Sequence, residues 1–173
     1  MDEICKKLQD CKQCRFADDI INIWDEKTGN GKFGCYSYSD KATIMIVGQN
    51  PSHVRYPAPI NHSMAGHQGD LFREIMGEEN LILSNLIAIS TPDNKVNAQD
   101  AIHGLVHLKE QIEFWKPKVL IALGAFCRDT IPNNLVSETI YLKHPDYYQT
   151  YRKEHLPLYR ETIEDIAKTI KRC

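Results

Sequence analysis

Two amide side chains lie in a tight turn that follows a short apolar run. The run covers residues 43–47, and the turn consists of Gly48, Gln49, Asn50, Pro51 and Ser52. Glycine and proline on either side of the amides favour a sharp change of chain direction. Each amide offers hydrogen-bond donors and an acceptor, so the pair can orient a water molecule or hold a polar ligand. An ordinary turn at the end of a strand would use the same residue types.

A histidine occupies an equivalent place after a second apolar run, 139–142. The residues at this place are His144, Pro145, Asp146, Tyr147 and Tyr148. A histidine held by a neighbouring proline can act as an electrophile or a proton donor. A single histidine is also a common core residue. The two tyrosines can stack on nucleobases or pack within the protein.

Asn85 interrupts a third apolar run, 81–90. A buried asparagine needs hydrogen-bond partners. Those partners are either the backbone of a turn or the polar edge of a bound base. Before this run, the glycine-containing stretch 63–72 includes Met64 and suits a close approach of backbone to a ligand.

The chain contains six cysteines, and two of them, Cys11 and Cys14, have the spacing of a metal knuckle. In a reducing compartment cysteines are metal ligands, buried core residues or reactive thiols more often than disulfides.

The overall composition narrows the class of protein. With 173 residues, 42% hydrophobic and 25% charged, the chain suits one globular domain, which we place at 1–173 with the cysteine-containing segment 1–40 packed on it. No apolar run is long enough for a membrane span, and the first residues lack the pattern of a signal peptide, so we expect a cytoplasmic protein. The net charge of −2 favours a small-molecule enzyme over a nucleic-acid-binding protein, but it leaves room for a local basic groove.

The elements that must position these residues alternate between strand and helix. Apolar runs predict strands at 43–47, 81–90, 119–123 and 139–142. Helical spacing predicts helices at 69–76, from Asn97 to Pro117, and at about 158–172. This alternation predicts an α/β fold of three layers, α/β/α, around a mostly parallel four-stranded sheet. Ligands of such folds bind at the carboxyl ends of the strands, where the polar residues described above lie.

Taken in order, these motifs resemble those of the uracil-DNA glycosylase superfamily. Its first motif, Gly-x-(Asp/Asn/Ala)-Pro, is similar to Gly48-Gln49-Asn50-Pro51, and its second motif begins with histidine, as at His144-Pro145. The similarity is greatest to the iron–sulfur branch, family 4. The stretches that resemble that branch are Cys11-x-x-Cys14, Met64–Phe72, Ser84–Ile89, Gln111–Gly124 and His144–Tyr147.

The resemblance implies a DNA glycosylase of base excision repair, which hydrolyses the N-glycosidic bond of uracil or a related modified base. By this resemblance Asn50 positions the attacking water, and His144 stabilises the negative charge that grows on the departing base. Gln49 stands where family 4 usually has an acidic residue, so we include it among the expected catalytic residues. No metal is required for this chemistry.

The same resemblance implies how substrate is held. Asn85 would read the uracil edge, and Met64 replaces the family's base-stacking phenylalanine. The other expected substrate-binding residues are Gly48, Pro51, Ser52 and Tyr147. The target base must leave the helical stack, and Tyr147, Tyr148 or Arg152 would fill the gap. The implied partner of the protein, which we expect to be a monomer, is DNA with uracil or a modified base.

The cysteines depart from the family 4 pattern. Its third and fourth cluster ligands align with Ile89 and Gly104, which cannot bind metal, so the usual four-cysteine cluster is excluded. Three alternatives remain: Cys11 and Cys14 are relics without metal, they join a histidine-containing site, or a relocated site holds zinc or an iron–sulfur cluster on Cys5, Cys11, Cys14 and Cys35. We expect Cys127 in the core and Cys173 to be free.

Two other functions are compatible with the sequence. One is a relative that binds or modifies uracil-containing or modified DNA without hydrolysis, which the substitutions at Met64, Ile89 and Gly104 suggest. The other is a nucleotide or nucleoside enzyme on the same fold, which would suit the net charge.

Overall fold

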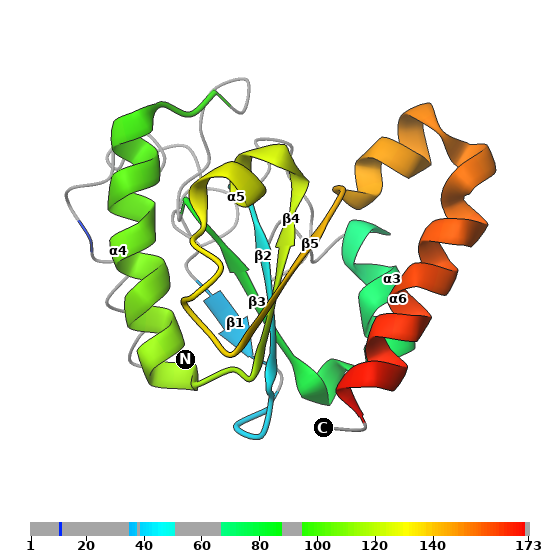
Figure 1. Cartoon of the computed structure of the whole chain (residues 1–173), viewed down its shortest axis with the longest axis horizontal. Coiled ribbons are helices and arrows are strands. Elements are labelled where there is room, and N and C mark those ends of the chain that lie inside the picture. The colour runs from blue at the N-terminus through cyan, green and yellow to red at the C-terminus, as the bar shows by residue number, and fades with distance from the viewer. Residues whose placement is uncertain (1–10, 12–34, 38, 51–66, 88–94, 172–173) are drawn as a thin grey trace, which may run out of the picture.

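The protein is built around a five-stranded sheet (Figure 1). The structure, a computed structural model, describes residue 11 and the ranges 35–37, 39–50, 67–87 and 95–171. The strand order is β1-β3-β2-β4-β5, and β1 runs antiparallel to its neighbour while the other four are parallel. The strands are β1 (Cys35–Ser37), β2 (Ile44–Gly48), β3 (Leu81–Asn85), β4 (Val119–Leu123) and β5 (Glu138–Leu142).

The central strands are apolar on both sides because helices cover both faces of the sheet. Every residue of β2, β3 and β4 is buried. Side chains along a strand point alternately to opposite faces, so Met45 and Val47 join one core while Ile44 and Ile46 join the other. This continuous apolar pattern is typical of parallel sheets.

Two pairs of helices form the outer layers. One face carries α4 (Ala98–Trp115) and α5 (Gly124–Thr130), and the other carries α3 (His67–Met76) and α6 (Leu156–Ile170) (Figure 1). Three short helical segments complete the described elements: η1 (Glu78–Asn80), the π-helix η3 (Tyr147–Tyr151) and η4 (Lys153–His155).

Local sequence signals fix both ends of α4. The Asn97 side chain accepts a hydrogen bond from the Asp100 backbone N–H at 2.8 Å, and the Asp100 carboxylate accepts one from Asn97 N–H at 3.0 Å, which forms a capping box. At the other end Lys116 adopts a left-handed conformation with φ of 50°, and Pro117 follows it. The helix therefore begins and ends where the sequence predicts.

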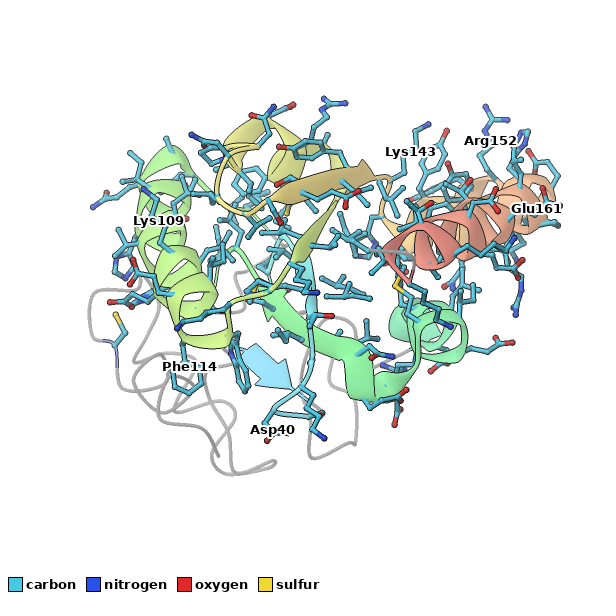
Figure 2. The ribbon with its side chains drawn as sticks, turned by 60° about the horizontal axis from the view of Figure 1, so that its bottom comes forward. Asp40, Lys109, Phe114, Lys143, Arg152 and Glu161 are labelled. Carbon is cyan, nitrogen blue, oxygen red and sulfur yellow. The ribbon has the colours of Figure 1, made fainter. Side chains whose placement is uncertain are left out.

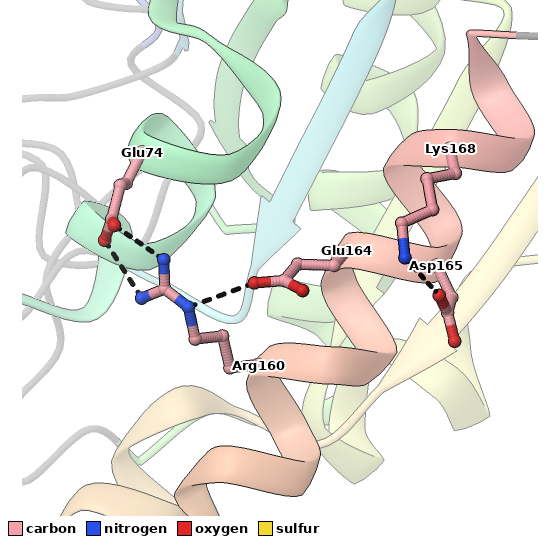
Figure 3. Close-up of polar contacts among 5 residues, drawn as sticks. All are labelled: Glu74, Arg160, Glu164, Asp165 and Lys168. Carbon is pink, nitrogen blue, oxygen red and sulfur yellow. Dashed lines mark hydrogen bonds and ion pairs between the residues drawn. The ribbon is translucent and has the colours of Figure 1, made fainter.

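An arginine joins the two helices of the other face (Figure 3). Arg160 of α6 donates two hydrogen bonds to the Glu74 carboxylate of α3, at 2.6 and 3.1 Å, and a third to Glu164 at 3.1 Å. The hydrogen bonds from Arg160 hold the pKa of Glu74 below its ordinary value. This forked contact links α6 to α3 at the surface, above the apolar side chains that pack between them.

The predicted fold class is confirmed, with local differences. The four expected parallel strands are present, and β1 adds a fifth that its three residues do not signal in the sequence. Within the apolar run 81–90, the strand covers Leu81–Asn85, and the next two described residues, Leu86 and Ile87, bond to Gly48 and Gln49 without being part of the strand. Within the described ranges, no helix combines the length and apolar character needed to cross a membrane.

Candidate functional site

The carboxyl ends of the four parallel strands lie at one edge of the sheet. Gly48 pairs with Asn85 across β2 and β3, Val47 pairs with Ala122 across β2 and β4, and Leu123 pairs with Leu142 across β4 and β5. Because the strands end in register, the residues that follow them share this edge. β4 separates β2 from β5, so the turns that follow these two strands begin about 10 Å apart.

Gln49 and Asn50 form the turn directly after β2. Asn50 is buried, with 8% of its surface exposed, whereas Gln49 is half-buried. The backbone N–H of Leu86 donates to Gly48 O at 2.8 Å, and that of Ile87 donates to Gln49 O at 2.9 Å. These two hydrogen bonds extend the pairing beyond the strands and fix the turn that carries the amides.

Asn85 is the last residue of β3 and is completely buried. Its neighbour Ser84 is also buried and donates a hydrogen bond to the side-chain oxygen of Gln111 in α4. A polar contact therefore crosses from the sheet to α4 directly beside Asn85. Gln111 is completely buried in this contact. The sequence did not indicate that its side chain bonds to Ser84.

His144 lies two residues beyond β5, with about a third of its side chain exposed (30%). Its Nδ1 accepts a hydrogen bond from the Asp146 backbone N–H at 3.3 Å, and the Asp146 carboxylate lies 3.5 Å away. Burial lowers the pKa of His144, and the Asp146 charge opposes this with a smaller effect. The lowered pKa favours the neutral ring, and in that form an accepting Nδ1 places the proton on Nε2.

Two neighbours support the backbone around His144. The Tyr159 hydroxyl of α6 donates to Lys143 O at 2.8 Å, and the Tyr159 ring stacks on Tyr148 with centroids 4.4 Å apart. On the other side Gly124 begins α5 with φ of 84°, and a Cβ at this position would lie 3.8 Å from the His144 Cβ. The histidine thus lies between the start of α5, the end of β5 and α6.

A basic and aromatic cavity of about 410 Å³ is formed by residues that follow β5, and Lys143, the residue before His144, lines it. Lys143 lies 4.5 Å from the centre of the Tyr147 ring, a cation–π contact, and Arg152 forms a hydrogen bond with Tyr147 that raises the arginine pKa. Figure 2 shows Lys143 and Arg152 at the same end of the molecule. The residues that line the cavity are Lys143, Tyr147, Tyr148, Arg152, His155 and Leu158.

Several predicted residues lie outside the described part of the chain. For substrate binding these are Pro51, Ser52 and Met64, and for metal binding they are Cys5, Cys14 and the side chain of Cys35. Their roles remain predictions. Cys173 and Ile89 also lie outside it, whereas Cys127 is buried as predicted, and burial raises the pKa of its thiol to about 12.

The four-cysteine cluster of the family 4 branch does not fit this chain. A Cβ added at Gly104 would overlap the carbonyl oxygen of Leu86 and lie 3.0 Å from its carbonyl carbon. A cysteine at this position would therefore force α4 away from the sheet. The structure instead brings Cys11 close to two histidines of the same helix, His103 and His107. Their spacing of four residues was the available signal, since it places both on one helix face.

The comparisons with known proteins agree with this fold. A family model described as the uracil DNA glycosylase superfamily matches residues 35–167. No curated protein sequence matches the chain. The crystal structure of wild-type SMUG2 of Pedobacter heparinus superimposes with a TM-score of 0.51 at 10% sequence identity, covering 77% of each chain. At this identity the structural match shows the fold alone.

The match to the family model covers most of the chain and includes all four parallel strands, α4 and the residues from Gly48 to His144. The chain therefore belongs to the uracil DNA glycosylase superfamily.

Proposed function

We propose that this protein is a DNA glycosylase that hydrolyses the N-glycosidic bond of uracil or a related modified base. The observation that carries this proposal is the strand register, because it gives Asn50, Asn85 and His144 positions at a common sheet edge. The three residues supply different chemistry: a water-binding amide, a base-reading amide and a neutral imidazole.

Asn50 is the residue to which we assign the attacking water. An amide cannot remove a proton from water, but its carbonyl oxygen can accept a hydrogen bond and hold the molecule in place. Positioning is sufficient where the sugar already develops positive charge as the glycosidic bond breaks. Burial of Asn50 and the hydrogen bonds of the turn support a fixed orientation.

His144 is the residue to which we assign the leaving group. When the bond from C1′ to the base nitrogen breaks, both electrons leave with the base, and negative charge develops on its carbonyl oxygens. The Nε2–H of a neutral imidazole can donate to such an oxygen, as in an oxyanion hole. The lowered pKa of His144 and its accepting Nδ1 favour this form.

The hydrolysis is then completed without a cofactor. The water oxygen forms a bond to C1′, one water proton passes to solvent, and the base anion takes a proton from solvent. The products are the free base and an abasic sugar in an unbroken strand.

Asn85 is suited to reading the base because an amide presents a donor and an acceptor side by side. Uracil presents the matching acceptor and donor along one edge. Complete burial of Asn85 supports discrimination, since a base with the wrong edge would leave buried polar groups unpaired.

The assignment to the family 4 branch rests on the resemblance of stretches such as Gln111–Gly124. In this chain Gln49 replaces the acidic residue typical of that branch, so we propose that Asn50 holds the water without a carboxylate beside it. Gln49, which is half-buried directly after β2, would serve as a second hydrogen-bonding group beside Asn50.

The cavity lined by Lys143 and Arg152 supports DNA as the substrate. Lys143 and Arg152 supply positive charge, and Tyr147 and Tyr148 supply aromatic surface, which together suit phosphates and unstacked bases. Two positive side chains at one end of the molecule are compatible with DNA binding at a net charge of −2, although Arg152 also lies 3.6 Å from Glu154. Base extrusion is required because the glycosidic bond is not accessible inside a duplex.

The direct test is incubation with oligonucleotides that carry a single uracil, in single and double strands, followed by alkali. We expect strand cleavage at the uracil and free uracil in the supernatant. An oligonucleotide with thymine at the same position is the matched control. Absence of abasic sites under conditions where another glycosylase works, with the protein folded by circular dichroism, would contradict the proposal.

A further inference from the structure

Three potential metal ligands converge on the face of the sheet that carries α4. The Sγ atom of Cys11 lies 3.3 Å from His103 Nε2 and 3.3 Å from His107 Nε2, and the two nitrogens lie 3.0 Å apart. The two rings meet edge to face, with centroids 4.4 Å apart. Cys11 lies more than ninety positions earlier in the chain than either histidine, so this is a contact between distant segments.

A carboxylate behind one histidine orients it toward the other two groups. His107 is buried, and its Nδ1 lies 3.2 Å from the Glu110 carboxylate. Donation from Nδ1 to this carboxylate leaves the lone pair of Nε2 directed at Cys11 and His103. A carboxylate on the outer nitrogen is the usual support of a metal-binding histidine.

The distances are close to those of a tetrahedral site. With bonds of about 2.0 Å to nitrogen and about 2.3 Å to sulfur, zinc ligands lie about 3.3 to 3.6 Å from one another. The observed separations are 3.0 to 3.3 Å. Within the described part of the chain, no other three such groups converge.

We propose that Cys11, His103 and His107 bind a zinc ion that ties the segment around Cys11 to α4. One thiolate and two imidazoles are typical zinc ligands. An iron–sulfur cluster generally uses four thiolates, and Gly104 excludes the fourth-ligand position of the family 4 pattern. On binding, the Cys11 thiol releases its proton to solvent, and no redox step is involved.

The position of this site predicts its role. Gly104 lies between the two histidines and packs on the Leu86 carbonyl, and the Leu86 N–H bonds to Gly48. The zinc ion would therefore stabilise the packing of α4 on the segment that supports the turn of Asn50. This role is structural and does not depend on the proposed glycosylase activity.

The first test is metal content and stability of the purified full-length protein. We expect about one Zn²⁺ per chain, and a melting temperature that falls after chelation and recovers when Zn²⁺ is added back. Protein that is folded yet takes up no Zn²⁺ on dialysis, and melts identically with and without chelator, would overturn the proposal. The three groups would then form a hydrogen-bonded cluster.

The second test identifies the ligands. Replacing zinc by Co²⁺ should give visible bands of tetrahedral cobalt and a thiolate-to-cobalt charge-transfer band in the wild-type protein. Cys11→Ser should weaken that charge-transfer band, and Glu110→Gln should lower metal affinity about 10- to 100-fold. His103→Ala should lower it further, and His155→Ala, a histidine beside α6, is the control that should retain full affinity. Wild-type affinity in His103→Ala and His107→Ala, or a wild-type cobalt spectrum without the charge-transfer band, would rule out the assigned ligands.

Discussion

Gly104 of α4 packs directly on the backbone carbonyl of Leu86, with no room for a Cβ between them. The N–H of the same residue, Leu86, donates to Gly48 O at 2.8 Å. Leu86, the residue directly after β3, therefore contacts both α4 and the turn that carries Asn50. The position of α4 and the shape of the candidate site are therefore linked through Leu86.

We expect Gly104→Ala to destabilise the protein by about 1–3 kcal/mol, because the added methyl group would overlap a backbone oxygen that cannot move aside. Helix propensity alone predicts the opposite sign, a gain of about 1 kcal/mol. Urea unfolding followed by circular dichroism distinguishes the predicted loss of stability from the predicted gain. Ile102→Ala is the control, since this side chain is 68% exposed on the same helix. A Gly104→Ala variant as stable as wild type would show that α4 is not packed as described.

Asn50→Ala and His144→Ala should each reduce the rate of uracil excision by about 10²-fold or more, because each would remove one preorganised polar group. Single-turnover assays on a uracil oligonucleotide measure this effect without interference from product release. Asn134→Ala is the matched control, since this exposed asparagine precedes β5 at the opposite edge of the sheet. Unchanged rates in both site variants would remove these two residues from the proposed mechanism.

Asp146→Asn should lower the pKa of His144 further. The Asp146 carboxylate is the group that opposes the effect of burial, and without its charge the imidazolium loses stabilisation. NMR titration of the His144 ring protons reports the pKa directly. In the wild type the titration should lie below pH 6.5, so the neutral ring persists at neutral pH and is lost only as the pH falls through this lowered pKa. A wild-type titration above the ordinary histidine range would contradict the neutral imidazole.

Tyr159→Phe should reduce activity through the position of His144 rather than through contact with substrate. The variant keeps the ring stacked on Tyr148 but removes the hydrogen bond to Lys143 O, which costs about 1 kcal/mol of stability. We expect a lower kcat with little change in KM. Tyr151→Phe, at a tyrosine that is 74% exposed, should leave both unchanged. A change confined to KM would indicate that Tyr159 affects DNA binding instead.

The fold could be predicted because its signals are local. The apolar strands, the capping box of Asn97 and the stop at Pro117 are each encoded within a few neighbouring residues. β1 could not be predicted, because a strand of three residues depends on its pairing with β3. The π-helix after Asp146 carries no sequence signal, and such segments occur often at functional sites.

The candidate site was predictable only in part, because some of its contacts join segments that are far apart in the sequence. Asn50, Asn85 and His144 follow apolar runs, and parallel topology alone brings them to one edge. The convergence of Cys11 on His103 and His107 requires a contact between segments far apart in the sequence. Spacing along the chain favoured other cysteines as metal ligands beside Cys11, whereas the described structure brings two imidazoles of α4 next to it.

Lys143→Ala and Arg152→Ala should weaken DNA binding to a similar extent for uracil-containing and normal duplexes, because phosphate contacts carry no sequence information. Each lost phosphate contact should also reduce the slope of log affinity against log salt concentration by about 1. Fluorescence anisotropy at several salt concentrations measures both quantities. Lys41→Ala is the control, because this exposed lysine adjoins Asp40, which Figure 2 shows at the end of the molecule far from Lys143 and Arg152. An unchanged salt dependence in both variants would mean that DNA does not cross the cavity lined by Lys143 and Arg152, and the binding surface would have to be sought elsewhere on this sheet edge.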